Sequence, residues 1–164
     1  MLKIKGILVL AMLFVTLPLQ AEVIERVSAF IDDEAITLSE LEDAYRKTVK
    51  LKPDISYEEV LNTLINRSLI LMDARRLRLE AESDEAVIEQ YIDLKVRAFV
   101  NISENEIEDF FNKNKAEFKG LKLKDVREKI EVYLEEKEVN EKLKSQIEKL
   151  KEGVYIKIIY YPVQ

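Results

Sequence analysis

Residues that favour β-strands gather at the two ends of this chain of 164 residues, and helical periodicity fills the stretch between them. Residues 23–31 form one apolar, β-branched run, which resumes at Ala35 and Ile36 after an acidic turn. Residues 154–161 form the other. Because a lone strand leaves its backbone groups without partners, we expect the last strand to pair with the N-terminal hairpin. The pairing closes the chain on itself, either within one molecule or by exchange between two copies.

Capping boxes predict where three of the intervening helices begin, because a Ser or Thr is followed three residues later by Glu. These boxes are Thr37–Glu40, Ser56–Glu59 and Ser103–Glu106. The helix after Ser56 carries apolar residues on more than one face, so we expect it to have neighbours on several sides and to end near Ala81. Two more helices are expected, one after Ser83 and one from about Lys124 to Lys151. The predicted fold class is therefore mainly α with a small β element.

Helical spacing also predicts which faces are buried. In the helix after Ser83, the buried face would hold Val87, Tyr91, Leu94 and Ala98, with Phe99 beside it. In the long helix, the apolar stripe runs from Val126 to Leu150 and includes Tyr133. The stripe does not keep a strict heptad, so it predicts packing within a domain more than a coiled-coil seam.

The composition excludes most catalytic classes. The chain has no His and no Cys, which removes Ser-His and Cys-His nucleophiles, the usual zinc sites and all disulfides. Chemistry by carboxylates alone would need two acidic groups converging in a pocket, and no spacing singles out such a pair. We predict no catalytic residue, no cofactor and no metal site. The net charge of −6 also disfavours nucleic acid as a partner.

The first residues have the plan of a secretory signal peptide. Lys3 and Lys5 precede an apolar run over residues 7–17, and Ala21 offers a small residue for cleavage. The apolar run is shorter than the roughly 20 residues of a spanning helix. We therefore predict a signal peptide at residues 1–21, a single domain at residues 22–164 and a periplasmic location. The alternative is an uncleaved segment that anchors the protein in the inner membrane.

The order of these segments resembles that of the SurA-type periplasmic chaperones. The strand and turn leading into Thr37-Leu38-Ser39-Glu40-Leu41 resemble the start of that family, and residues 60–71 are similar to its central apolar helix. Residues 102–111 and 115–118 look like the helix that leads into the family's parvulin domain. Residues 125–130, continuing to the terminal strand, look like the helix and strand that come after that domain. The order of these motifs carries the resemblance.

The chain departs from the family where the parvulin domain would be inserted. Between Phe118 and Leu121 it has only Lys119 and Gly120, and it lacks the His residues that parvulin sites use. The resemblance therefore implies the helical chaperone core, which binds unfolded outer-membrane proteins without ATP, and no prolyl isomerase activity.

A chaperone of this kind needs exposed apolar or aromatic side chains in a hydrophilic surround. Six aromatic residues are the candidates for client binding: Tyr45, Tyr91, Phe99, Phe110, Phe111 and Tyr133. The competing prediction is a structural or adaptor protein that binds one folded envelope partner, with a homodimer formed by strand or helix exchange. A groove for extended peptide would favour the chaperone, and a flat, self-complementary patch would favour the adaptor.

Overall fold

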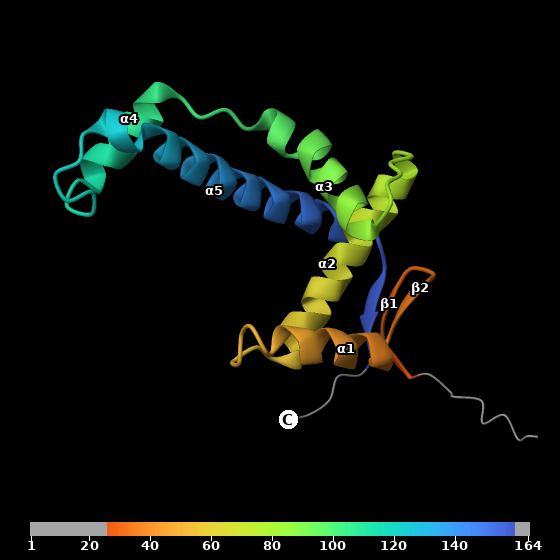
Figure 1. The fold of residues 1–164 in the computed structure, drawn as a ribbon. Coiled ribbons are helices and arrows are strands. Elements are labelled where there is room, and N and C mark those ends of the chain that lie inside the picture. Colours follow the sequence, from red (N-terminus) through yellow and green to blue (C-terminus); the bar gives the residue numbers. More distant parts are fainter. Residues whose placement is uncertain (1–25, 160–164) are drawn as a thin grey trace, which may run out of the picture.

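The computed structural model describes residues 26–159 (Figure 1). The predicted signal peptide, at residues 1–21, lies outside the described residues. Within the described range, five α-helices and a short 3-10 helix accompany a small three-stranded antiparallel sheet, as the sequence predicts. The elements in chain order are β1 (Val27–Ile31), β2 (Glu34–Thr37), α1 (Leu38–Thr48), α2 (Tyr57–Arg76), α3 (Asp84–Lys95), η1 (Arg97–Phe99), α4 (Glu104–Lys113), α5 (Leu123–Glu152) and β3 (Ile156–Ile158).

The sheet joins the two ends of the described chain. Its strand order is β2-β1-β3, and β3 pairs with β1 in the register that sets Ile31 opposite Ile156. The predicted pairing of the C-terminal strand with the N-terminal hairpin is therefore confirmed, within one molecule. Asp32 fastens the junction: its backbone N–H donates to the Tyr155 carbonyl at 2.9 Å, and its carboxylate accepts from the Tyr155 N–H at 2.8 Å. The acidic turn thus has a structural role at the start of β3.

Helix α2 lies at the centre of the larger hydrophobic core. It begins at a complete capping box formed by Ser56 and Glu59 and is contacted by α1, α3, α5 and β1. Seven of its residues are buried: Val60, Leu61, Ile65, Leu69, Ile70, Leu71 and Ala74. The expectation that this helix has neighbours on several sides is confirmed. Full burial of each large aliphatic side chain contributes about 1.5–3 kcal/mol to folding, so this helix anchors the domain.

A buried tyrosine joins three helices where α2, α3 and α5 meet. The Tyr91 side chain is fully buried, and its hydroxyl donates to Asp73 Oδ2 of α2 at 2.8 Å. The same hydroxyl accepts a hydrogen bond from Gln146 Nε2 of α5 at 3.1 Å. Burial raises the pKa of Tyr91 to about 12, with the neighbouring Asp73 carboxylate acting in the same direction.

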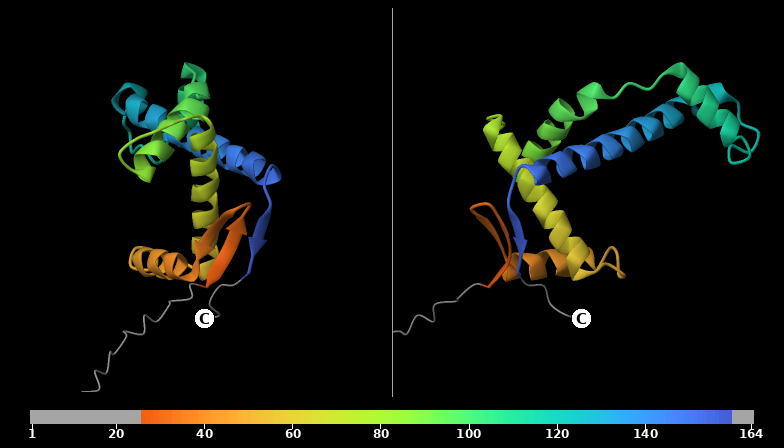
Figure 2. Two further views of the ribbon diagram at one scale, coloured as in Figure 1. Left: turned by 90° about the vertical axis from the view of Figure 1, so that its right-hand side faces the viewer. Right: turned by 180° about the vertical axis from the view of Figure 1, so that it is seen from behind.

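Helix α5 connects this core to a second, smaller one, which lies at the start of α5 (Figures 1 and 2). Its last turns place Ile147 in the core around α2. Its first turns place Val126 and Ile130 against Ile107 and Phe111 of α4, and these four buried residues form a separate cluster. The molecule is therefore bent. The sheet, α1 and α2 form one part, which we call the base. Helix α5 forms an arm that projects from it. We call the far end of the arm, where α4 packs on the start of α5, the tip.

Some predicted boundaries and faces are wrong. α2 ends at Arg76, before Ala81, because the chain turns at Arg78, whose φ is +59°. α3 ends at Lys95, and Leu94 and Ala98 lie exposed although helical spacing had placed them on the buried face. Because the helix stops and a 3-10 turn follows, the helical periodicity assumed over residues 84–99 does not continue. In the long helix Tyr133 is also exposed.

We expect the tip to unfold locally when its own cluster is weakened. Ile107 is fully buried there, and Ile107→Ala removes apolar contacts at a cost of about 2–5 kcal/mol. Amide hydrogen exchange should accelerate in α4 and the first turns of α5, while α2 and β1 keep their protection. Equal acceleration in both regions would contradict the division into two clusters.

The Tyr91 hydroxyl should stabilise the three-helix junction. Tyr91→Phe should lower the free energy of unfolding by about 1–2 kcal/mol, because Asp73 and Gln146 lose a buried partner. The exposed Tyr155→Phe is the matched control and should change it by less than about 0.5 kcal/mol. In urea titrations the stability of the native protein should fall as pH rises from 10 towards 12, because only the unfolded state ionises this tyrosine there. Tyr91→Phe should remove that part of the pH dependence.

Candidate functional site

The structure separates the six aromatic candidates into buried and accessible residues. Tyr91 and Phe111 are buried in the two cores, so neither side chain is presented at the surface. Phe99 and Tyr133 are the most accessible, with 69% and 54% of each residue exposed. Tyr45 is half-buried and stacks on Tyr57 with ring centroids 3.8 Å apart. Phe110 is half-buried at the tip.

The tip brings four of the chain's aromatic rings together. Phe110 contacts Tyr133 with ring centroids 5.2 Å apart, and Phe111 stacks on Phe118 at the same separation. The chain forms this cluster because α4 packs against the start of α5, and the connection between them turns at Lys119 and Gly120, both with positive φ. Leu121 and Val132, also at this end, are each about half exposed. The tip thus presents apolar side chains around an aromatic cluster in which only Phe111 is fully buried.

A second accessible region lies at the end of α3, where Phe99 and Leu94 are exposed. Arg97 holds this segment against the arm. Its guanidinium donates to Glu136 at 2.6 Å and to Asp93 at 3.0 Å, and it lies within ion-pair distance of Glu89 and Glu135. These hydrogen bonds raise the pKa of Arg97 further above its ordinary value, so the side chain stays charged. Phe99 is therefore presented from a fixed 3-10 turn.

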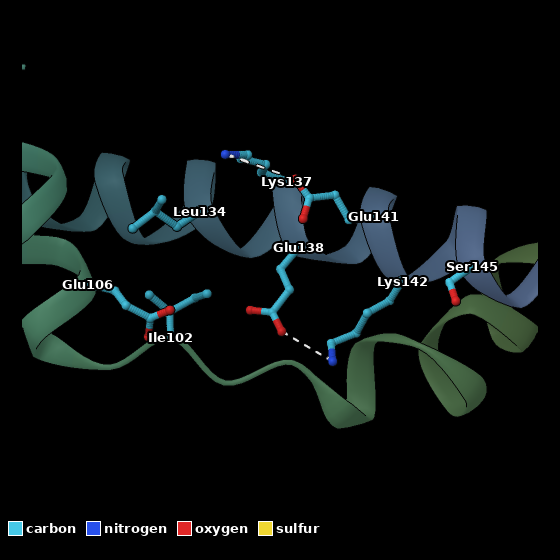
Figure 3. Close-up of a pocket in the computed structure, with 8 residues that line it drawn as sticks. All are labelled: Ile102, Glu106, Leu134, Lys137, Glu138, Glu141, Lys142 and Ser145. Carbon is cyan, nitrogen blue, oxygen red and sulfur yellow. Dashed lines mark ion pairs between the residues drawn. The ribbon is translucent and has the colours of Figure 1, made fainter.

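A groove of about 510 Å³ lies between α5 and the extended segment that leads into α4 (Figure 3). Ile102 and Leu134 supply its apolar part. The rest is mostly charged and self-neutralised, since Lys142 pairs with Glu138 at 3.2 Å and Lys137 approaches Glu141 at 4.0 Å (Figure 3). A groove of this character suits water and polar backbone more than apolar client side chains.

The third accessible region is β3, which the sequence interpretation used only to close the fold. Tyr155, Ile158 and Ile159 are 65%, 46% and 50% exposed. β3 is an edge strand, so its far side has no strand partner among the described residues. Alternation of apolar residues around Lys157 was the available signal, but periodicity alone does not say which strand lies at the edge of a sheet.

The carboxyl groups with shifted pKa values have structural roles. The pKa of Glu59 is lowered by the Ser56 backbone N–H in a capping box, and that of Glu106 by the Ser103 hydroxyl. The Arg127 guanidinium lowers the pKa of Glu104 and fixes α4 against α5 with a hydrogen bond of 2.6 Å. Each shift favours the ionised form, whereas a general acid at neutral pH needs the opposite.

The described part of the chain offers neither a metal site nor a membrane span. Residues 26–159 contain no group of three or more acidic side chains placed to hold a metal ion. No helix in that range is both long and apolar enough to cross a membrane.

No protein-family model matches the chain, and no curated protein shows significant similarity to it. The resemblance to SurA-type chaperones therefore stays a prediction that rests on the order of the sequence motifs. The three accessible regions, at the tip, at the end of α3 and at β3, are the structural basis for a functional proposal.

The assignment of Phe111 to the buried cluster and of Tyr133 to the accessible surface can be tested at the tip. Phe111→Ala should reduce the opening free energy of α4 amides by about 3–5 kcal/mol, because it leaves a cavity in a small cluster. Tyr133→Ala should reduce it by about 1 kcal/mol or less, because its ring is exposed and contacts mainly Phe110. Native-state hydrogen exchange measures both, and equal losses would show that Tyr133 belongs to the core.

Proposed function

We propose that the protein is an ATP-independent holdase that binds unfolded exported proteins, above all outer-membrane β-barrel proteins, in the periplasm. The observation that carries this proposal is the distribution of exposed large apolar residues. Most of them lie in three separate regions, with Tyr133 at the tip, Phe99 at the end of α3 and Ile158 in β3, and the other two, Leu51 and Leu77, lie in the connections before and after α2. A flexible client can contact all three at once, whereas a small ligand cannot.

The physical requirements of a holdase fit such a surface. Each contact with a single exposed aromatic or aliphatic side chain is weak, so a client can be released without ATP, while several contacts together hold it. The net charge of −6 opposes association between copies of the chaperone itself. The alternating apolar residues of unfolded barrel strands supply the matching client surface.

The resemblance to SurA-type proteins supports the same proposal and accounts for the missing isomerase. In that family the parvulin domain would be inserted at Lys119 and Gly120. In the structure these residues form the loop at the far end of the arm, where an inserted domain would not disturb the base. We therefore propose a chaperone core without prolyl isomerase activity.

The competing proposal is an adaptor for one folded envelope partner, alone or as an exchanged dimer. A tight complex with a folded partner buries one continuous surface of about 800 Å² on each side, with an apolar centre. The exposed apolar residues here are instead spread over both ends of the arm and the base. This spread favours the holdase.

The test is light scattering of a urea-unfolded outer-membrane β-barrel protein after dilution, with and without the chain that starts at Glu22. We expect suppression of aggregation at near-stoichiometric amounts. The double variant Phe99→Ser, Tyr133→Ser should need several-fold more protein for the same suppression, because it removes two accessible aromatic contacts.

The matched control is Glu128→Ser, Lys149→Ser, which changes two exposed residues of α5 and leaves the net charge unchanged. This control should act like the native protein. No suppression by the native protein at large excess would overturn the holdase proposal, and equal activity of the aromatic double variant would exclude Phe99 and Tyr133 from the binding surface.

A further inference from the structure

The open edge of β3 has a hydrogen-bonding pattern that can be worked out from its pairing with β1. The Ile159 N–H donates to the Ser28 carbonyl, and the Tyr155 carbonyl accepts from the Asp32 N–H. In an antiparallel pair such bonds recur at every second residue. The backbone groups of Lys157 therefore face β1, and those of Ile156 and Ile158 face the open edge.

Nothing else in the described part of the chain covers this edge. β3 is the outer strand of the sheet, and it lies on the outside of the base with no helix or strand beyond it (Figure 2, left). Ile158 is 46% exposed, and Tyr155 and Ile159 flank it on the opposite face of the strand. An exposed edge with apolar side chains is a template for pairing with another extended segment.

From this geometry we propose that the β3 edge captures an extended segment of an unfolded client as an added strand of the sheet. The proposal rests on the proposed holdase function and names how, and with what kind of segment, the protein binds. The added strand would bond to the N–H and C=O groups of Ile156 and Ile158. Its side chains would lie beside two isoleucines on one face and beside Tyr155, Lys157 and Ile159 on the other.

Lys157 argues against a second copy of this chain as the occupant. Consider two β3 strands that pair antiparallel about a two-fold axis. The outward N–H and C=O groups of Ile156 and Ile158 are all hydrogen-bonded only when Ile156 of one copy pairs with Ile158 of the other. That register sets Lys157 directly opposite Lys157 of the second copy, and like charges opposite each other destabilise a strand pair. An exposed lysine in an edge strand is also a common device against self-association.

The same residue favours a client strand with a carboxylate. On the face of Lys157, an Asp or Glu of the incoming strand would form a cross-strand ion pair. On the face of Ile156 and Ile158, an apolar residue would fit. The occupant is therefore an amphipathic segment that alternates apolar and polar residues and carries an acidic residue among the polar ones. Membrane-spanning strands of β-barrel proteins have this alternation.

The first test removes the outward-facing backbone N–H of Ile158. Ile158→Pro removes the N–H that faces the open edge and leaves the bonds of Lys157 and Ile159 to β1 in place, a position where edge strands tolerate proline. Ile158→Ala is the matched control, because it removes the side chain and keeps the N–H. The probe is a short fluorescent peptide of alternating Val and Ser with a central Glu, measured by anisotropy with the chain from Glu22.

We expect Ile158→Pro to weaken peptide binding on the order of tenfold and Ile158→Ala to weaken it by less than about threefold. Equal losses in the two variants would overturn strand addition. The circular dichroism and unfolding midpoint of each variant establish that β3 still pairs with β1.

The second test does not depend on proline. The native protein should bind the peptide with a central Glu a few-fold more tightly than one with a central Lys. Lys157→Glu should reverse this preference by a similar factor. An unchanged preference would overturn the proposed pairing.

The light-scattering assay distinguishes failure of the edge proposal from failure of the holdase proposal. If the native protein suppresses aggregation and these variants bind peptide as it does, the edge proposal fails and the holdase stands. If the native protein does not suppress aggregation, the holdase proposal and the edge proposal fail together.

Discussion

Burial of α2 on several sides is the constraint on which the rest of the structure depends. A helix with apolar residues on only one face needs one packing partner. In α2, Ile70 and Leu71 widen the apolar stripe formed by Leu61, Ile65 and Leu69, so this helix needs partners on several sides. The partners come from both ends of the chain, since β1 precedes α2 and the last turns of α5 follow it by some seventy residues. Closure of the sheet by β3 is a consequence of this arrangement, because α5 ends beside α2 and delivers the next residues to β1.

The arm is a consequence of how α5 uses its length. Thirty residues of helix span roughly 45 Å, more than the core around α2 can cover. Most of its apolar residues therefore serve two clusters, one at each end, and the middle carries charged residues such as Glu138 and Lys142 beside one buried apolar residue, Val139. Between the clusters, the segment after α3 is held by the ion pairs of Arg97 and by the buried Val96. Exposed ion pairs contribute little free energy, so the tip depends on its own four buried residues.

Local signals in the sequence predict the elements well and their exposure poorly. The capping boxes at Thr37, Ser56 and Ser103 are all present, and the predicted pairing of the two ends is correct. Errors arise where tertiary structure decides. Helical spacing put Tyr91 and Leu94 on one face, but Tyr91 is buried between α2 and α5 and Leu94, at the last turn of α3, is half exposed.

The candidate site shows the same limit. Composition identified aromatic residues as candidates, yet no single-sequence signal distinguishes the buried Phe111 from the accessible Tyr133, since both lie at helical spacing next to apolar neighbours. Exposure at β3 was missed because the edge position of a strand depends on the order of strands in the sheet. That order becomes visible only when the chain is folded.

Under the proposed function, the distance between the accessible regions is itself useful. The tip and β3 lie near opposite ends of α5, and an extended chain gains about 3.3 Å per residue, so a segment of roughly fourteen residues spans the arm. An unfolded client longer than this can bind both regions at once, and the second contact then forms within one complex at high effective concentration. A folded partner gains this advantage only if its own surface is shaped to reach both places. Folding of a client shortens its reach and removes one contact, which makes release a direct result of folding.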